Sequence, residues 1–220
     1  RDYQCQKIIA QELSDLGFQC HSFDRNNTKN IFAHYGKSKD PLFLFAGHTD
    51  VVPTGPLEAW QHPPFSAHTD GTVIHGRGTQ DMKGNLAAMI TATKRFLKAC
   101  PNPGFSIGFA ITSDEEGPGK DGMIYLVDEL KKKNIHSTWT VVGEPTSSKK
   151  IGDFYKIGRR GSINLNLQFT GKQGHVAYLP NDDNIIHRVA SWLHDLNATN
   201  WPQHTDFPKI SLHTTHLTST

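Results

Sequence analysis

The chain has 220 residues, a formal net charge of +2 and 36% hydrophobic residues, enough for one large domain or for one domain and part of a second. The small charge argues against a nucleic-acid surface, and no apolar run approaches the roughly 20 residues that cross a bilayer. The three cysteines are widely spaced and form no Cys-x-x-Cys motif, which argues against a disulfide framework and against a thiolate zinc site. We therefore expect a soluble globular protein with reduced thiols, located in the cytoplasm.

The first half of the chain contains predicted helices, strands and one long loop. Apolar residues at helical spacing between Tyr3 and Leu16, followed by Gly17, predict an amphipathic helix. Residues 30–35 are predicted as a strand, and residues 42–46 as a strand buried on both faces. Residues 51–79 are rich in Pro, Gly and Trp and should form an ordered loop that walls a site. Its three histidines, His62, His68 and His75, are expected to be solvated.

The second half repeats the pattern of strand, polar segment and helix. A helix is predicted to begin near Asp81, with Leu86, Met89, Ile90, Thr93, Phe96 and Leu97 on one face. The elements predicted after it are a strand over 105–111, a helix over 121–133 and a short buried strand over 139–142.

Acidic residues and one histidine follow the predicted strands directly. His48 and Asp50 come after the strand over 42–46, and Asp50 is placed to orient the His48 ring, although a capping turn would also explain both residues. Asp81 opens a helix, either as its N-cap or as a carboxylate whose two oxygens bridge two cations. Glu144 follows the strand over 139–142.

Three consecutive acids, Asp114, Glu115 and Glu116, follow the strand over 105–111. They repel one another unless cations are present, and neighbours in extended chain point to opposite sides. One of the two glutamates is therefore expected to bind metal and the other to transfer a proton, while a solvated acidic loop is the alternative. Because parallel strands end at the same edge of a sheet, these groups should converge into a nitrogen and oxygen site for zinc, manganese or cobalt.

Four motifs in chain order resemble those of the dinuclear zinc peptidases and deacylases related to aminoacylase and carboxypeptidase G. They are His48-Thr49-Asp50, the segment from Gly76-Arg77-Gly78 to Asp81-Met82-Lys83-Gly84, Ser113-Asp114-Glu115-Glu116-Gly117 and Gly143-Glu144-Pro145. Within this family, residues 158–162 and 171–178 are similar to the branch that removes a succinyl group from diaminopimelate. The resemblance extends over nearly the whole chain.

The resemblance implies a role for each residue of the site. His48 and Glu144 would bind one zinc, Glu116 the other, and Asp81 would bridge them next to a cis peptide bond with Met82. Asp50 would orient His48. Glu115 would be the general base that takes a proton from the attacking water and delivers it to the leaving amine. The complete protein would hold two Zn²⁺ per subunit, with Co²⁺ or Mn²⁺ as possible substitutes.

The resemblance also implies how substrate is bound and how the chain is organised. Arg159, Ser162 and Tyr178 would bind the anionic small-molecule substrate, and His175 would stabilise the oxyanion in the active site of a partner subunit of a homodimer. The implied fold is α/β. Residues 1–160 would form the zinc-peptidase-like catalytic domain, with a mixed sheet flanked by helices. Residues 161–220 would form part of a small ferredoxin-like dimerisation lid, with strands over 163–169 and 210–217 and a helix over 184–196.

Family members are longer, so we expect this chain to be a fragment that lacks a late histidine of the second metal site. Two alternatives stay open. The substrate could be that of a related acetylornithine deacetylase, aminoacylase or carboxypeptidase. The domain could also be a dimerising or ligand-binding module without turnover.

Overall fold

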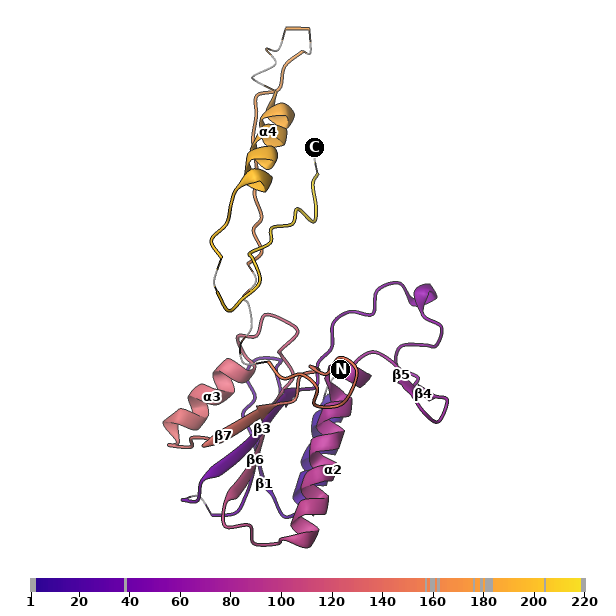
Figure 1. Ribbon diagram of the computed structural model, residues 1–220, viewed down its shortest axis with the longest axis vertical. Coiled ribbons are helices and arrows are strands. Elements are labelled where there is room, and N and C mark those ends of the chain that lie inside the picture. Colours follow the sequence, from indigo (N-terminus) through magenta and orange to yellow (C-terminus); the bar gives the residue numbers. More distant parts are fainter. Residues whose placement is uncertain are drawn as a thin grey trace. The chain divides into compact units, whose positions relative to one another are not determined.

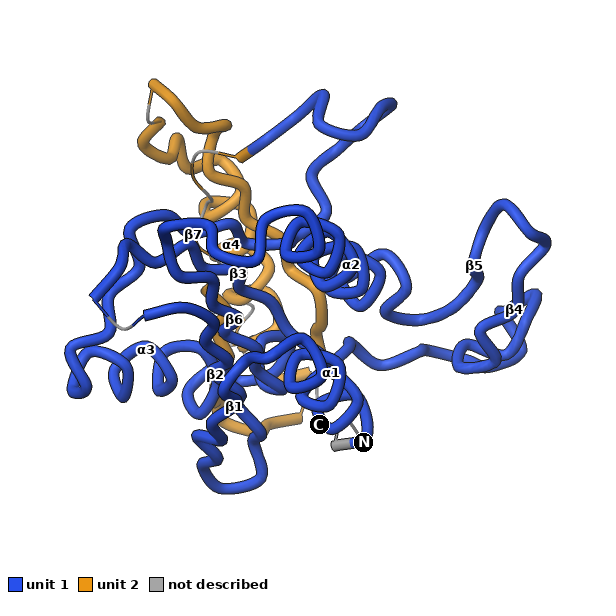
Figure 2. Tube along the Cα trace, turned by 90° about the horizontal axis from the view of Figure 1, so that it is seen from below, with its two compact units in different colours: residues 1–155 blue, residues 156–220 orange. Residues whose placement is uncertain are grey.

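The computed structural model describes residues 3–37, 39–156, 158, 161, 163–175, 177–178, 180, 184–203 and 205–218. The chain divides into two compact units, residues 1–155 and residues 156–220 (Figure 2). None of the helices in the described part of the chain has the length and apolar character that a bilayer span requires.

The first unit contains a five-stranded mixed sheet (Figure 1). Its strand order is β1-β2-β6-β3-β7 (Figure 2). Strands β1 (Gln19–Ser22), β2 (Asn30–Tyr35) and β6 (Ser106–Thr112) pair in antiparallel fashion. Strand β3 (Leu42–His48) is parallel to both β6 and β7 (Trp139–Val142). The predicted mixed α/β sheet is therefore confirmed, whereas β1 was not predicted from the sequence.

Helices cover both faces of this sheet (Figure 2). On one face α1 (Tyr3–Asp15) and α2 (Gly84–Ala99) pack on alternate residues of β2 and β6, and Leu13 and Phe109 have no exposed surface. On the other face α3 (Met123–Lys132) packs through Leu126 and Leu130 on Phe32 and Leu44. Each such large apolar side chain stabilises the fold by about 1.5–3 kcal/mol when fully buried.

Two predictions about the first unit are wrong in detail. Strand β7 has the predicted bounds but is not buried, since Trp139 is 55% and Val142 59% exposed. The reason is its place at the edge of the sheet, where β3 is its one strand partner among the described residues. Phe96 was expected on the buried face of α2 but is 40% exposed.

The long loop over residues 51–79 is ordered and contains only short elements. A 3-10 turn, η1 (Leu57–Ala59), precedes a small hairpin of β4 (His68–Thr69) and β5 (Ile74–His75), and η2 (Thr79–Lys83) then leads into α2.

The second unit contains α4 (Ile185–Ala198), whose first turn is capped by Asn184, because its side chain accepts the N–H of Ile186. This matches the predicted helix. The strands predicted over 163–169 and 210–217 are not formed, because a strand requires a hydrogen-bonded neighbour and no strand pairing occurs among the described residues of this unit. The role of this unit as a dimerisation lid stays a prediction, as does its predicted boundary.

Candidate metal centre

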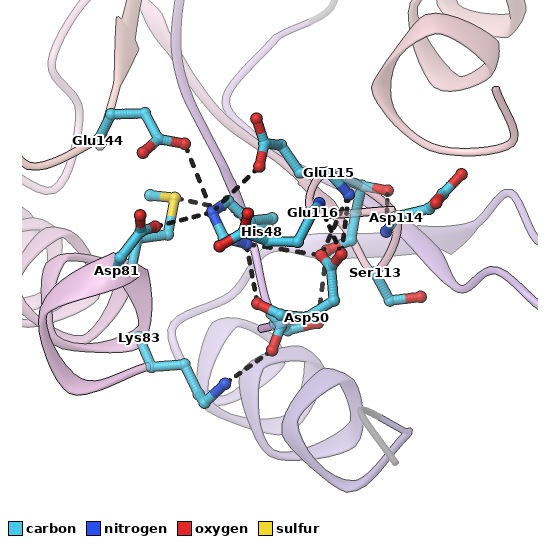
Figure 3. A network of polar contacts seen from close by, with 12 residues as sticks. His48, Asp50, Asp81, Lys83, Ser113, Asp114, Glu115, Glu116 and Glu144 are labelled. Carbon is cyan, nitrogen blue, oxygen red and sulfur yellow. Dashed lines mark hydrogen bonds and ion pairs between the residues drawn. The ribbon is translucent and has the colours of Figure 1, made fainter. Parts of the chain in front are cut away.

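Three of the four predicted ligands lie at or after the carboxyl ends of the parallel strands β3, β6 and β7, and Asp81 comes from η2. Figure 3 shows these side chains around His48. His48 is the last residue of β3 and lies opposite Thr112, the last residue of β6. The acidic segment, residues 114–116, follows β6 after Ser113. Strand β7 ends beside the same end of β3 and leads to Glu144. Residues that are far apart in sequence therefore meet because their strands run in the same direction.

His48 is at the centre of the cluster. Its side chain is 1% exposed, and its Nε2 atom lies 3.1 Å from Asp81 Oδ1, 3.4 Å from Glu144 Oε1 and 3.7 Å from Glu115 Oε2. Its Nδ1 atom is 3.0 Å from the Asp50 carbonyl oxygen and 3.5 Å from Asp50 Oδ1, so the carbonyl is the nearer acceptor. The second ring nitrogen is thus held by Asp50, which leaves Nε2 facing the acids.

Asp50 has a second function that sequence reasoning missed. Its carboxylate accepts the backbone N–H of Glu115 at 3.0 Å and that of Glu116 at 2.8 Å (Figure 3). Because a carboxylate accepts several hydrogen bonds at once, Asp50 fixes the acidic segment and the His48 ring together. No sequence signal indicates this contact, since it joins segments about 65 residues apart.

Asp81 lies within η2, at a kink before α2, and is not the N-cap of that helix. Its φ of −118° and ψ of 99° are not helical, and the cap position of α2 is Lys83. The capping alternative is therefore wrong. The peptide bond between Asp81 and Met82 is cis, as the resemblance implied.

Met82 anchors the segment that carries Asp81. It is completely buried, and its Sδ atom accepts the N–H of His48 at 3.3 Å. A Cβ atom at Gly47 would come within 2.4 Å of Met82 Cε and 2.9 Å of Leu86 Cδ2. Gly47, the penultimate residue of β3, therefore permits the close approach that places Asp81 beside His48.

Two groups of side chains in the described residues could hold a metal ion. One consists of His48, Asp81 and Glu116, and the other of His48, Glu115 and Glu144, with ligand atoms within 4.8 Å of one another in each group. All donors are nitrogen or carboxylate oxygen, a set suited to zinc, manganese or cobalt. The four predicted metal ligands are thus divided between two groups that share His48, and Glu115 lies in the group that contains Glu144.

The pKa shifts show an excess of negative charge at this edge. Burial by itself would lower the pKa of His48, but its contacts with Asp50 and the charge of Glu115 raise that pKa to about 9. Burial, followed by the charges of Asp81 and Glu115, raises the pKa of Glu116 above its ordinary value. The carboxylates repel one another and keep a proton on the buried imidazole. A divalent cation bound among them would neutralise this excess negative charge.

The remaining predicted site residues lie in the second unit. The His175 ring is 5.3 Å from the Tyr178 ring between centroids, and His175 Nδ1 accepts the N–H of Ala177 at 3.1 Å. Arg159 and Ser162 lie outside the described residues. The substrate-binding and oxyanion roles of these residues stay predictions.

The histidines of the long loop form a separate cluster. His62 and His68 stack with their ring centroids 3.7 Å apart, and His75 lies 5.2 Å from His62. None of the three belongs to either possible metal group of the described residues. His62 and His75 instead help to line a cavity of about 240 Å³ together with Trp60.

Comparison with known proteins agrees with this geometry. The chain is 46% identical over 217 residues to a succinyl-diaminopimelate desuccinylase from Hahella chejuensis, covering 98% of this chain and 56% of the relative. It is 47% identical over 206 residues to a protein of the same name from Shewanella pealeana, covering 94% of this chain and 54% of the relative. The chain therefore spans about half the length of the curated relatives it matches.

Solved structures share the fold at lower identity. Human carnosine dipeptidase 1 matches with a TM-score of 0.57 at 23% identity, covering 66% of this chain and 33% of that protein. An M20 family metallo-carboxypeptidase from Sulfolobus solfataricus matches with a TM-score of 0.55 at 22% identity, covering 66% of this chain and 32% of that protein. The family model described as peptidase family M20/M25/M40 matches residues 44–215. That range includes every predicted ligand and most of both units, so the chain belongs to peptidase family M20/M25/M40.

Proposed function

We propose that the protein is a metal-dependent amidohydrolase that cleaves N-succinyl-LL-2,6-diaminopimelate into succinate and LL-diaminopimelate. The observation that carries the proposal is the convergence of His48, Asp81, Glu116 and Glu144 at one edge of the sheet. The substrate is supported by the names of the curated relatives, which are 43–47% identical to this chain.

The side chains of the cluster would hold two divalent cations, with zinc as the expected ion and cobalt or manganese as substitutes. His48 and Glu144 would bind one ion, Glu116 the other, and Asp81 both. Bound there, the ions would lower the pKa of water and polarise the carbonyl of the amide. The buried, acid-rich surroundings of His48 support this assignment.

Glu115 is the proposed general base. Its backbone is fixed by Asp50, and its side chain is 40% exposed at the edge of the cluster, where a substrate can reach it. It would accept a proton from the attacking water as the new carbon–oxygen bond forms. It would then deliver that proton to the leaving amine nitrogen as the carbon–nitrogen bond breaks.

We assign recognition of the succinyl group and formation of the homodimer to the second unit. Arg159 offers a planar fork for a substrate carboxylate, and Ser162 and Tyr178 would complete the binding site. His175 would stabilise the oxyanion in the partner subunit of a homodimer. The residue motifs quoted above support these roles.

We also infer that the protein acts in the cytoplasm. Cys5, Cys20 and Cys100 are all free. Free thiols are the ordinary state of cysteine in a reducing compartment.

The test is a comparison of two substrates with the natural full-length protein. We expect release of succinate from N-succinyl-diaminopimelate to exceed release of acetate from N-acetylornithine, and we expect a chelator to abolish both. Preference for the acetyl substrate would identify a different deacylase, and absence of turnover on either substrate with metal bound would support a binding module.

A further inference from the structure

Thr49 stands between the two residues that define the metal centre, His48 and Asp50. It has no exposed surface, and its own N–H donates to the carbonyl oxygen of Thr112 at 2.9 Å. Its hydroxyl also donates to that oxygen at 3.3 Å. Because Thr112 ends β6 directly before the acidic segment, Thr49 connects the end of β3 to the end of β6.

Two side chains from elsewhere in the chain hold Thr49. The Nε2 atom of Gln6, on helix α1, donates to the Thr49 hydroxyl at 3.1 Å. The Nζ atom of Lys83 donates to the Thr49 carbonyl oxygen at 2.7 Å. Gln6, Thr49 and Thr112 thus form a continuous chain of hydrogen bonds, in which each bond polarises and strengthens the next.

Gln6 is poorly explained by stability alone. Its side chain is 3% exposed, and its Oε1 atom is buried without a hydrogen-bond donor among the described residues. An unsatisfied buried carbonyl destabilises a fold, so an apolar residue of the same shape, such as methionine, would suit the site at least as well. Polar groups that are unfavourable for stability are typical of residues that serve a site.

We propose that Gln6 is a positioning residue of the metal centre that acts through Thr49, fixing the spacing between His48 at the end of β3 and Glu115 and Glu116 after β6. The inference rests on the proposed function, since it requires that the cluster binds metal. Gln6 lies 43 residues from Thr49 in sequence and belongs to none of the motifs of the site.

The test compares isosteric variants of both partners in the natural full-length protein, with Co²⁺ as the probe and its visible absorption as the readout. Gln6→Met removes the hydrogen bond to Thr49, Thr49→Val removes that bond and the one from the Thr49 hydroxyl to Thr112, and Thr49→Ser retains the hydroxyl. We expect Gln6→Met and Thr49→Val to weaken Co²⁺ binding about tenfold, as is typical for loss of a contact behind a metal ligand. We expect Thr49→Ser to bind like the wild type.

Two further measurements separate positioning from a structural role. The midpoint of thermal unfolding of the metal-free Gln6→Met protein should be unchanged or higher, because the unsatisfied carbonyl is gone. The double variant Gln6→Met/Thr49→Val should bind Co²⁺ no more weakly than the weaker single variant, because both remove the same bond.

Three outcomes would overturn the inference. One is Co²⁺ binding by Gln6→Met within twofold of the wild type, and another is additive losses in the double variant. The third is a lower unfolding midpoint with unchanged affinity, which would indicate a structural role. If Gln6→Met does not fold, Gln6→Leu, which also removes the donor to Thr49, replaces it in the same comparison. A wild-type protein that binds no Co²⁺ would instead refute the proposed function itself.

Discussion

The carboxylate of Asp50 accepts the backbone N–H of Glu116 at 2.8 Å, although 66 residues separate them in sequence. The same aspartate accepts the N–H of Glu115, and its carbonyl oxygen lies 3.0 Å from His48 Nδ1. One residue therefore sets both the orientation of the imidazole and the place of the acidic segment. Changes at Asp50 should act on the whole cluster.

Asp50→Asn should weaken metal binding by about 10–100-fold, because the amide loses the charge and presents an NH₂ group to donors that need an acceptor. Competition with a chelating dye measures the affinity. Asp128→Asn is the matched control, since Asp128 is exposed and forms its ion pair with Lys131 one helical turn away, on α3. Equal affinities of the two variants would contradict the role of Asp50.

Glu115→Gln should lower kcat by about 10²–10⁴-fold, the usual range for loss of a general base, while the metal content per chain stays the same. Elemental analysis and a succinate-release assay give the two values. Glu115 also belongs to one of the two possible metal groups. A variant that loses metal would make Glu115 a ligand, and one that keeps full activity would exclude it from catalysis.

Metal binding should release a proton. In the metal-free protein the pKa of His48 is raised from 6.5 to about 9, so the ring is charged at pH 7, whereas a metal ligand must be neutral. Apparent affinity should therefore rise with pH and level off above about pH 9. Calorimetric titration with Zn²⁺ in two buffers of different ionisation enthalpy measures the proton release. Identical heats in both buffers would contradict it.

The same shift affects the metal-free fold. The pKa of His48 is higher in the folded than in the unfolded state, so protonation of the ring stabilises the fold. This contribution is fully present below pH 6.5 and is lost as the pH rises through 9. Denaturant unfolding of the protein after metal removal with a chelator should show this decrease in the free energy of unfolding.

Gly47→Ala should destabilise the protein by about 1–3 kcal/mol, the typical cost of overpacking, because the new Cβ would overlap Met82 and press on Leu86. It should also weaken metal binding, since Met82 follows Asp81. Urea unfolding of the variant measures the loss of stability. In the double variant Gly47→Ala/Met82→Ala the two losses should be less than additive, and strict additivity would show that the predicted contact is not the cause.

Much of the first unit could be predicted from the sequence. The bounds of β2 and, to within one residue, of α1 follow from hydrophobic periods and from stop residues, which act locally, whereas β3 continues two residues past its predicted end to His48. The candidate ligands could also be found, because His48, Glu116 and Glu144 each follow a short apolar segment. Parallel strands that end together must bring such residues to one edge.

Other features could not be predicted. The exposure of β7 depends on its edge position, which no property of its four residues determines. The alternating segments over 163–169 and 210–217 have the period of strands, but a strand exists only where a partner supplies hydrogen bonds. Pattern alone overestimates the burial of β7 and the strand content of the second unit.

The sequence by itself determined the kinds of donor atom and the edge of the sheet at which they gather. Only the tertiary structure decided how they are held: Asp50 on the acidic segment, Lys83 and Gln6 on Thr49, and Met82 against Gly47. The physical reason is range. Local periodicity acts within a few residues, whereas these contacts join residues 34 to 66 positions apart and depend on strand register, which exists only once the sheet has formed.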